Sequence, residues 1–134
     1  MQTSHQKTAC RIWLTAGLLL LSSFSHALGL GEPNLTSKLG EPLRMEIPLI
    51  NTADLSVEQL IVGAANQRQY EKFKIGYLSI YRDLRYSIVE HDNHLFVAIK
   101  SHAPVKEPYL DILLTLKWPN GELVKSVTVL LDAP

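Results

Sequence analysis

The sequence predicts an all-β fold with minor α content, an antiparallel β-sandwich that carries one short surface helix. Two observations support this prediction. Apolar and polar residues alternate with a period of two in several short segments from Leu43 onward, and clusters of Gly, Pro, Asn and Asp separate these segments. Strands with such alternation bury one face and expose the other, which is the pattern of two antiparallel sheets packed face to face.

The N-terminal segment 1–27 is typical of a secretory signal peptide. Two cations and no acidic residue precede the apolar stretch 12–21, and Ser25-His26-Ala27 places small residues at the two positions that signal peptidase reads. The apolar stretch is shorter than the roughly 20 residues that a membrane-spanning helix needs. We therefore expect cleavage between Ala27 and Leu28, a periplasmic location, and no stable membrane insertion after cleavage.

The remaining residues, 28–134, have the composition of a single globular domain. They include eleven Lys and Arg and thirteen Asp and Glu, a net charge of about −2, which argues against a nucleic-acid partner because nucleic-acid binders carry excess positive charge. The one cysteine, Cys10, lies in the signal segment. The domain is therefore expected to have no disulfide, no thiolate metal site and no cysteine nucleophile, and to depend on its hydrophobic core.

Three elements are expected in the first part of the domain. Leu43–Leu49 alternates as a strand with one buried face, and Pro48 places it at a sheet edge or interrupts its pairing, because proline has no N–H to donate. Residues 56–59 have the S-x-x-Q form of a capping box, which begins a short helical turn. The apolar run 60–64 then reads as a short buried strand.

The surface helix and a first hairpin follow. Residues 66–73 are expected to form the helix, with Asn66 as its N-cap. Strands 85–90 and 95–100 flank the polar tetrad 91–94, which has the length and chemistry of a hairpin loop.

A second hairpin provides the clearest strand. Tyr109–Trp118 and Leu123–Leu131 are joined by Pro119-Asn120-Gly121, in which glycine is expected to take the left-handed position of a bulge. The even-numbered residues of the first strand share one face and are all apolar: Leu110, Ile112, Leu114, Leu116 and Trp118. We expect these five side chains to face the core. Short strands joined in this way predict immunoglobulin-like connections.

Five segments, in order along the chain, carry a resemblance to a known family. They are Ala27–Glu32, Leu39–Leu43 with Glu46-Ile47, Ser101–Leu110, Trp118–Gly121 and Leu130–Pro134. In sequence and spacing they resemble the N-terminal periplasmic domain of the FimV family, and the resemblance covers nearly all of residues 28–134. It implies one domain over these residues.

The resemblance also implies a cellular role. In the FimV family this domain precedes a peptidoglycan-binding LysM module, a transmembrane helix and a long acidic cytoplasmic region with helical repeats, and the family is associated with type IV pilus assembly, twitching motility and organisation of the cell pole. The implied partners are envelope proteins such as the pilus secretin or inner-membrane assembly components. The sequence reaches only to Pro134, so a free periplasmic domain and a fragment of a longer protein both stay open.

The residues offer little for catalysis, and we expect no enzyme activity, no metal and no cofactor. His91, Asp92 and His94 are potential metal ligands in one loop, but no further ligand has an evident position, which favours a polar hairpin tip. No serine lies in a G-x-S-x-G elbow. Glu107 and Asp111 lack the cleft across which a glycosidase places its two carboxylates.

A locally basic stretch, residues 72–85, interleaves Tyr77 and Tyr81 with four cations. This pattern suits an acidic partner or a glycan. Loose charge clusters are common on protein surfaces, which favours a solvated face instead.

The segment Pro104–Tyr109 supplies the candidate partner-binding residues. Its two prolines prevent regular pairing, so it is expected to cross between sheets or to kink along an edge. A rigid exposed segment with an aromatic residue loses little entropy on binding. The candidate residues are Lys106, Glu107, Pro108 and Tyr109.

Two function hypotheses stay open. The first is a non-catalytic periplasmic protein-interaction module, and the alternative is a peptidoglycan- or glycan-binding module. An open strand edge would favour docking of a protein. A glycan site would instead need one of four rings to face outward: Tyr77, Tyr81, Tyr109 or Trp118.

Overall fold

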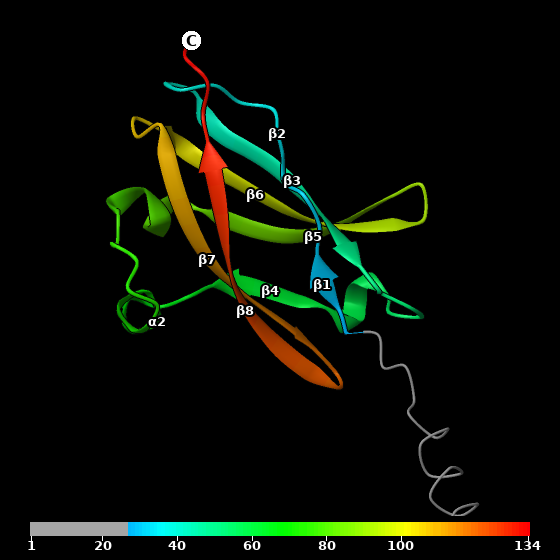
Figure 1. Ribbon diagram of the computed structural model, residues 1–134. Helices are drawn as coiled ribbons and strands as arrows, with labels where there is room; N and C mark the ends of the chain where they lie inside the picture. The colour runs from blue at the N-terminus through cyan, green and yellow to red at the C-terminus, as the bar shows by residue number, and fades with distance from the viewer. Residues whose placement is uncertain (1–26) are drawn as a thin grey trace, which may run out of the picture.

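The protein is described by a computed structural model over residues 27–134, and these residues form two antiparallel β-sheets packed face to face (Figure 1). The first sheet contains β1 (Gly29–Leu30), β2 (Asn34–Leu35), β3 (Pro42–Ile50), β5 (Arg85–His91) and β6 (His94–Pro104). The second contains β4 (Ile61–Ala64), β7 (Tyr109–Trp118) and β8 (Gly121–Leu130). The predicted all-β sandwich is confirmed. The expected signal segment 1–27 lies outside the described residues, apart from Ala27.

Helical structure is minor, as expected. The α-helix α2 spans Gln67–Lys72, and two short 3-10 segments, η1 (Val57–Gln59) and η2 (Ser79–Asp83), lie before and after it. Asn66 is the N-cap of α2, and its side-chain oxygen accepts the backbone N–H of Gln69 at 2.9 Å. Within residues 27–134 no helix is long and apolar enough to cross a membrane.

The hydrophobic core lies between the two sheets. β3 and β6 contribute one wall through Leu43, Met45, Ile47, Val97 and Ile99. β7 contributes the other wall through Leu110, Ile112, Leu114 and Leu116, which are fully buried. The predicted inward face of β7 is confirmed at these four positions, and Trp118 is partly buried against the same core.

Pro48 interrupts the pairing of β3, which was one of the two expected outcomes. β3 pairs with β6 along one side, whereas its other side pairs with β1 at Leu49–Ile50 and with β2 at Met45–Glu46. Between these two short pairings the Pro48 carbonyl accepts the N–H of Gly31 at 2.7 Å. Pro48 lacks an N–H to donate, and it lies between the residues of β3 that pair with β1 and those that pair with β2.

The expectation of a buried strand at residues 60–64 is wrong in its burial. A strand does form there, but β4 pairs with β7 alone and is an edge strand. Ile61 lies opposite Lys117 on the outer face of the sheet and is 66% exposed. Because residues 60–64 show no alternation of apolar and polar residues, the sequence does not indicate that one face of this strand is exposed.

Both hairpins form, with tighter turns than expected. Asp92 and Asn93 have φ of 49° and 63°, so they form a two-residue turn, and His91 pairs directly with His94. In the second hairpin Gly121 pairs with Trp118 and is not in the left-handed region. A Cβ at Gly121 would lie 3.0 Å from the Trp118 ring. Glycine is therefore needed here for close approach rather than for a positive φ.

The two sides of the sandwich differ. On one side β4 and β5 lie close to each other, which brings the edges of the two sheets together. On the other side the second sheet ends at β8, and the segment that contains β1 and β2 lies across from it (Figure 1). The candidate functional site lies on this second side.

Candidate functional site

Tyrosine hydroxyls close the edge of β7 where β4 does not reach. β4 pairs with β7 from Lys117 to Leu114. Beyond that point the Tyr70 hydroxyl accepts the N–H of Leu113 at 2.8 Å, and the Tyr81 hydroxyl accepts the N–H of Asp111 at 3.0 Å. Two side chains thus take the place of a missing strand, and this edge is not available for pairing.

The rings that carry these hydroxyls form a cluster with Tyr77. Tyr70 stacks on Tyr81 and meets Tyr77 edge to face, each at 5.0 Å between ring centroids. Burial raises the pKa of Tyr70 to about 12, and it also raises the pKa of Tyr81. The hydrogen bonds from the Leu113 and Asp111 N–H groups act in the opposite direction and lower these pKa values.

The opposite edge of the second sheet, along β8, is free. Because the N–H groups of Leu113 and Asp111 point away from β8, it is the even-numbered residues of β7 that bond to β8. Their partners in β8 are odd-numbered, for example Val127 opposite Ile112. The even-numbered residues of β8 therefore direct their backbone N–H and C=O groups outward: Glu122, Val124, Ser126, Thr128 and Leu130.

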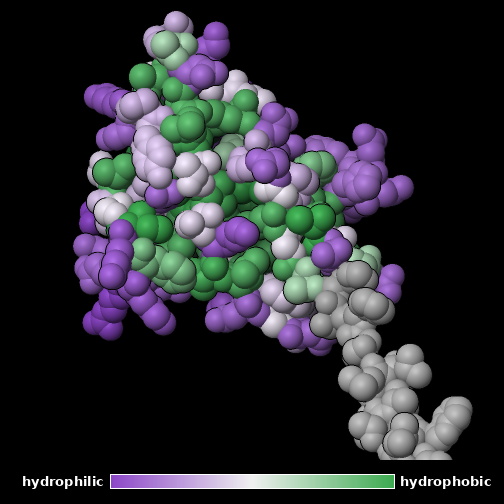
Figure 2. All heavy atoms as spheres, in the orientation of Figure 1, coloured by the Kyte–Doolittle hydropathy of each residue, from purple (hydrophilic) through white to green (hydrophobic). Residues whose placement is uncertain are grey.

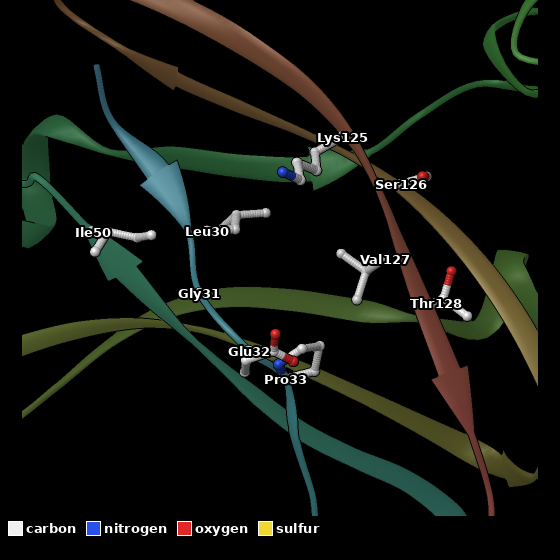
Figure 3. Close-up of a pocket in the computed structure, with 9 residues that line it drawn as sticks. All are labelled: Leu30, Gly31, Glu32, Pro33, Ile50, Lys125, Ser126, Val127 and Thr128. Carbon is white, nitrogen blue, oxygen red and sulfur yellow. The ribbon is translucent and has the colours of Figure 1, made fainter. Parts of the chain in front are cut away.

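A hollow of about 480 Å³ follows this edge. Its walls are the β8 residues 125–128 and the segment 30–33, with Ile50 beside them. In Figure 3, Leu30 and Val127 point toward each other into the space between the two walls, and the Lys125 side chain extends over it. The hollow is therefore partly apolar, and its charged groups are Lys125 and Glu32.

An exposed apolar pair lies at the C-terminal end of the same strand. Tyr109 and Leu130 are directly opposite each other and are 51% and 70% exposed. The Tyr109 hydroxyl donates to Asp111 at 3.0 Å, and Thr128 Oγ1 donates to the same carboxylate at 2.7 Å. These bonds hold the ring and the strand surface in one arrangement. Figure 2 shows hydrophobic residues (green) around the middle of this face and hydrophilic residues (purple) along its margins.

The candidate partner-binding segment lies beside this pair. It leaves the first sheet at Pro104 and enters the second at Tyr109, so the prediction that it crosses between sheets is confirmed. Val105 is buried, and its N–H donates to the carbonyl of Glu41 at 3.0 Å. Lys106 and Pro108 are exposed and Glu107 is partly buried. Of the candidate residues Lys106, Glu107, Pro108 and Tyr109, the last adjoins the free edge through Leu130.

The other candidate catalytic or metal-binding residues either form no group or are held in contacts with neighbouring side chains. His91 Nε2 lies 3.3 Å from Glu46 Oε1 on β3. Within residues 27–134 no three His, Cys, Asp or Glu side chains form a group suited to a metal. The Asp111 carboxylate accepts the hydrogen bonds from Tyr109 and Thr128 described above.

The basic stretch 72–85 does not form an outward surface of cations and aromatic rings, which was the alternative to a solvated face. Tyr81 is buried and Tyr77 is partly buried, and both rings belong to the tyrosine cluster. Of the four cations, Arg82 stays beside an aromatic ring, with its guanidinium 5.7 Å from the Tyr77 ring centroid. Burial of the apolar rings outweighs the sequence proximity of the charges.

A family model described as the FimV N-terminal domain, an Ig-like domain, matches residues 28–134. The chain belongs to this family. The resemblance and the immunoglobulin-like connections inferred from the sequence are confirmed. No solved structure matches the chain.

Two curated relatives carry a name that describes a role. The motility hub protein FimV of Pseudomonas aeruginosa PAO1 and that of the UCBPP-PA14 strain are each 37% identical to the chain over 122 residues. The match covers 90% of this chain and 13% of each relative. The chain therefore spans a small part of the length of the curated relatives that it matches.

Two features of the site could not be found from the sequence. The free edge of β8 depends on the order of strands in the second sheet, and a strand has the same alternation at an edge as in the centre. The sequence predicts a strand that includes Leu130 but does not show that Leu130 lies directly opposite Tyr109. The alternation of β8 is a usable signal, since it places Thr128 and Leu130 on one face.

Proposed function

We propose that this FimV N-terminal domain is a non-catalytic periplasmic protein-interaction module that docks an envelope partner along the free edge of β8. The observation that carries the proposal is the row of outward backbone groups on a strand of ten residues. An extended partner segment that pairs there gains main-chain hydrogen bonds, and side-chain contacts beside the strand supply specificity.

The surroundings of β8 favour strand addition. Proteins commonly block exposed edges with charges, prolines or covering loops. From Ser126 to Leu130 the strand contains neither a charged residue nor a proline. One face of an added strand would adjoin the exposed pair Tyr109 and Leu130, and the other would adjoin the hollow between Val127 and Leu30.

Family membership supports the cellular setting. The relatives are named as motility hub proteins. We carry this role to the present chain as participation in type IV pilus assembly, motility or cell-pole organisation, with the pilus secretin or inner-membrane assembly components as partners. The family match begins at Leu28, directly after the expected cleavage at Ala27, which supports export of the domain to the periplasm.

The ring positions favour a protein over a glycan. Tyr81 is buried, and Tyr77 and Trp118 are partly buried against the core. Tyr109 alone of the four candidate rings is mostly exposed, and its hydroxyl is bonded to Asp111. A peptidoglycan- or glycan-binding site usually needs flat rings with free polar groups around them, so this alternative has the weaker support.

Ser126→Pro tests the proposal directly. The N–H of Ser126 points outward from the sheet, so proline removes one edge donor without removing a bond to β7. The variant should unfold within about 1 kcal/mol of the wild type, since edge strands tolerate proline. It should lose the partner that the wild-type protein retains from solubilised envelopes.

Lys117→Ala is the matched control, because Lys117 lies on β7 away from the free edge. It should retain the partner. Tyr109→Ala should keep its stability and bind the partner less well. Retention of the same partner by Ser126→Pro and by Tyr109→Ala would contradict docking at this edge.

A further inference from the structure

Three cations form a row across the outer face of the first sheet. Arg44 on β3 and Arg85 on β5 are both directly opposite Lys100 on β6, the strand between them (Figure 1). Residues directly opposite each other in antiparallel strands share a face and have Cα atoms about 4.5–5.5 Å apart. Their neighbours Met45 and Ile99 are buried in the core, so the three cations lie on the solvent side.

A hollow of about 570 Å³ adjoins the row. It arises where the pairing of β3 with β6 shifts between Pro42 and Arg44. Ser101 Oγ accepts the N–H of Leu43 at 2.8 Å and donates to the carbonyl of Ala103 at 2.8 Å, which fixes the irregular backbone. Bulges of this kind redirect side chains and are frequent beside functional sites.

Asp83 holds the other side of the irregular segment. Its Oδ2 accepts the backbone N–H groups of His102 and Ala103 at 2.7 and 2.8 Å. His102 consequently lines the hollow together with Arg44, Arg85 and Lys100. The hollow is thus a fixed feature of the fold, with four nitrogen-bearing side chains around it.

None of the three cations of the row forms an ion pair with another of the described residues. Two carboxylates lie near the row. Glu46 lines a hollow with Arg44 and Lys100 but contacts His91 at 3.3 Å. Asp83 is close enough to interact electrostatically with Arg85, and its Oδ2 accepts two backbone N–H groups. Like charges placed directly opposite each other destabilise a sheet. An anion in the hollow would remove this repulsion.

We propose that Arg44, Lys100 and Arg85 bind a phosphate group. A phosphate ester carries a charge of about −1.5 to −2 and three acceptor oxygens. A guanidinium group offers two parallel N–H donors to such a group, so two arginines and a lysine beside one hollow match a phosphate better than a carboxylate, which has one charge and two oxygens. A soluble phosphate ester and a lipid headgroup both supply this chemistry.

The spacing of the row favours a phosphate group over an acidic peptide. Side chains on one face of an extended peptide are about 6.6–7 Å apart, whereas the cations repeat at the shorter distance between strands. The row lies on the sheet opposite to β8, so this site is independent of the docking edge proposed above.

Titration of the isotopically labelled protein with inorganic phosphate tests the site. Ionic strength is held constant with chloride, because exposed charges are screened by salt. We expect saturable shifts of the backbone amide signals of Arg44, Lys100 and His102. Arg85→Gln and Lys100→Gln should each raise the phosphate concentration at half-saturation severalfold. Lys117→Gln removes one exposed strand lysine from the other sheet and should leave it unchanged.

Vesicles separate the two sources of phosphate. Sedimentation with phosphatidylglycerol vesicles but not with phosphatidylcholine vesicles, reduced by Lys100→Gln, would assign the site to a headgroup, and phosphate saturation without vesicle binding would assign it to a soluble ester. Shifts that do not saturate, or an equal loss in Lys117→Gln, would overturn the site as unspecific charge attraction. Binding of poly-glutamate without any response to phosphate would overturn it in favour of an acidic peptide.

Discussion

Tyr70→Phe isolates the contribution of a side-chain hydroxyl that replaces a strand. The Tyr70 hydroxyl accepts the N–H of Leu113 at 2.8 Å and donates to the carbonyl of Leu113 at 3.3 Å. Both residues are buried, with exposed fractions of 1% and 0%. Removal of the oxygen leaves the Leu113 N–H without a partner in the core, and an unsatisfied buried donor costs about 1–3 kcal/mol. A domain of this size has a free energy of unfolding of about 5–15 kcal/mol.

Urea unfolding measures this cost. We expect the midpoint for Tyr70→Phe to fall with an unchanged m-value, because the ring remains and the buried surface is the same. Hydrogen exchange gives a local readout, since the Leu113 amide should lose protection beyond the global change.

Tyr77→Phe is the matched control. Its ring contacts Tyr70 edge to face, and its hydroxyl forms no hydrogen bond to another of the described residues. The free energy of unfolding should therefore change by less than about 0.5 kcal/mol. Equal effects of Tyr70→Phe and Tyr77→Phe would refute the assignment of the Tyr70 hydroxyl as the partner of the β7 edge.

The remaining predictions concern the core, alkaline pH and processing. Leu114→Ala should cost roughly 2–5 kcal/mol in urea unfolding, whereas Lys117→Ala should cost under about 0.5 kcal/mol, because Leu114 is fully buried and Lys117 is exposed; equal costs would contradict the register of β7. Burial raises the pKa of Tyr70 from 10.0 to about 12, and it also raises the pKa of Tyr86 above 10.0. The unfolded chain then loses its phenolic protons first, so stability should fall as pH rises above about 10, and an unchanged urea midpoint there would contradict it. Mass spectrometry of the exported protein should find Leu28 at the N-terminus, and an intact segment 1–27 would refute cleavage there.

Local pattern was enough to predict most strands and one face of the core. The alternation of β7 placed Leu110 and Leu116 inward because a strand turns each successive side chain to the opposite face. The same parity placed Leu113 outward, yet it is fully buried. The Tyr70 hydroxyl, from 43 positions earlier in the chain, bonds to the backbone of Leu113, so the tyrosine cluster lies beside this part of β7. Alternation reports the faces of a strand but not what covers them.

In the candidate site, too, the sequence predicts features that depend on neighbouring residues but not those that depend on strand pairing. The crossing of residues 104–109 followed from two prolines, which act on the backbone where they stand. The cation row required the alignment of three strands, since Arg44 and Arg85 meet only through Lys100. In the sequence Arg85 was grouped instead with the nearby cations of residues 72–85, and only the pairing of β5 with β6 assigns it to a different surface.

The two proposed surfaces lie on opposite sheets, and this determines how their effects should combine. The β8 edge belongs to the second sheet, whereas the cation row lies on the outer face of the first, with the core between them. Packed sheets are about 10 Å apart, and substitutions separated by more than about 7–10 Å without shared partners have additive effects. The double variant Ser126→Pro with Lys100→Gln should therefore lose as much partner binding as Ser126→Pro alone. It should lose as much phosphate binding as Lys100→Gln alone. If either loss in the double variant differs from that in the single variant, the two surfaces are coupled. The partner itself would then supply the anion, and the two surfaces would belong to one interface.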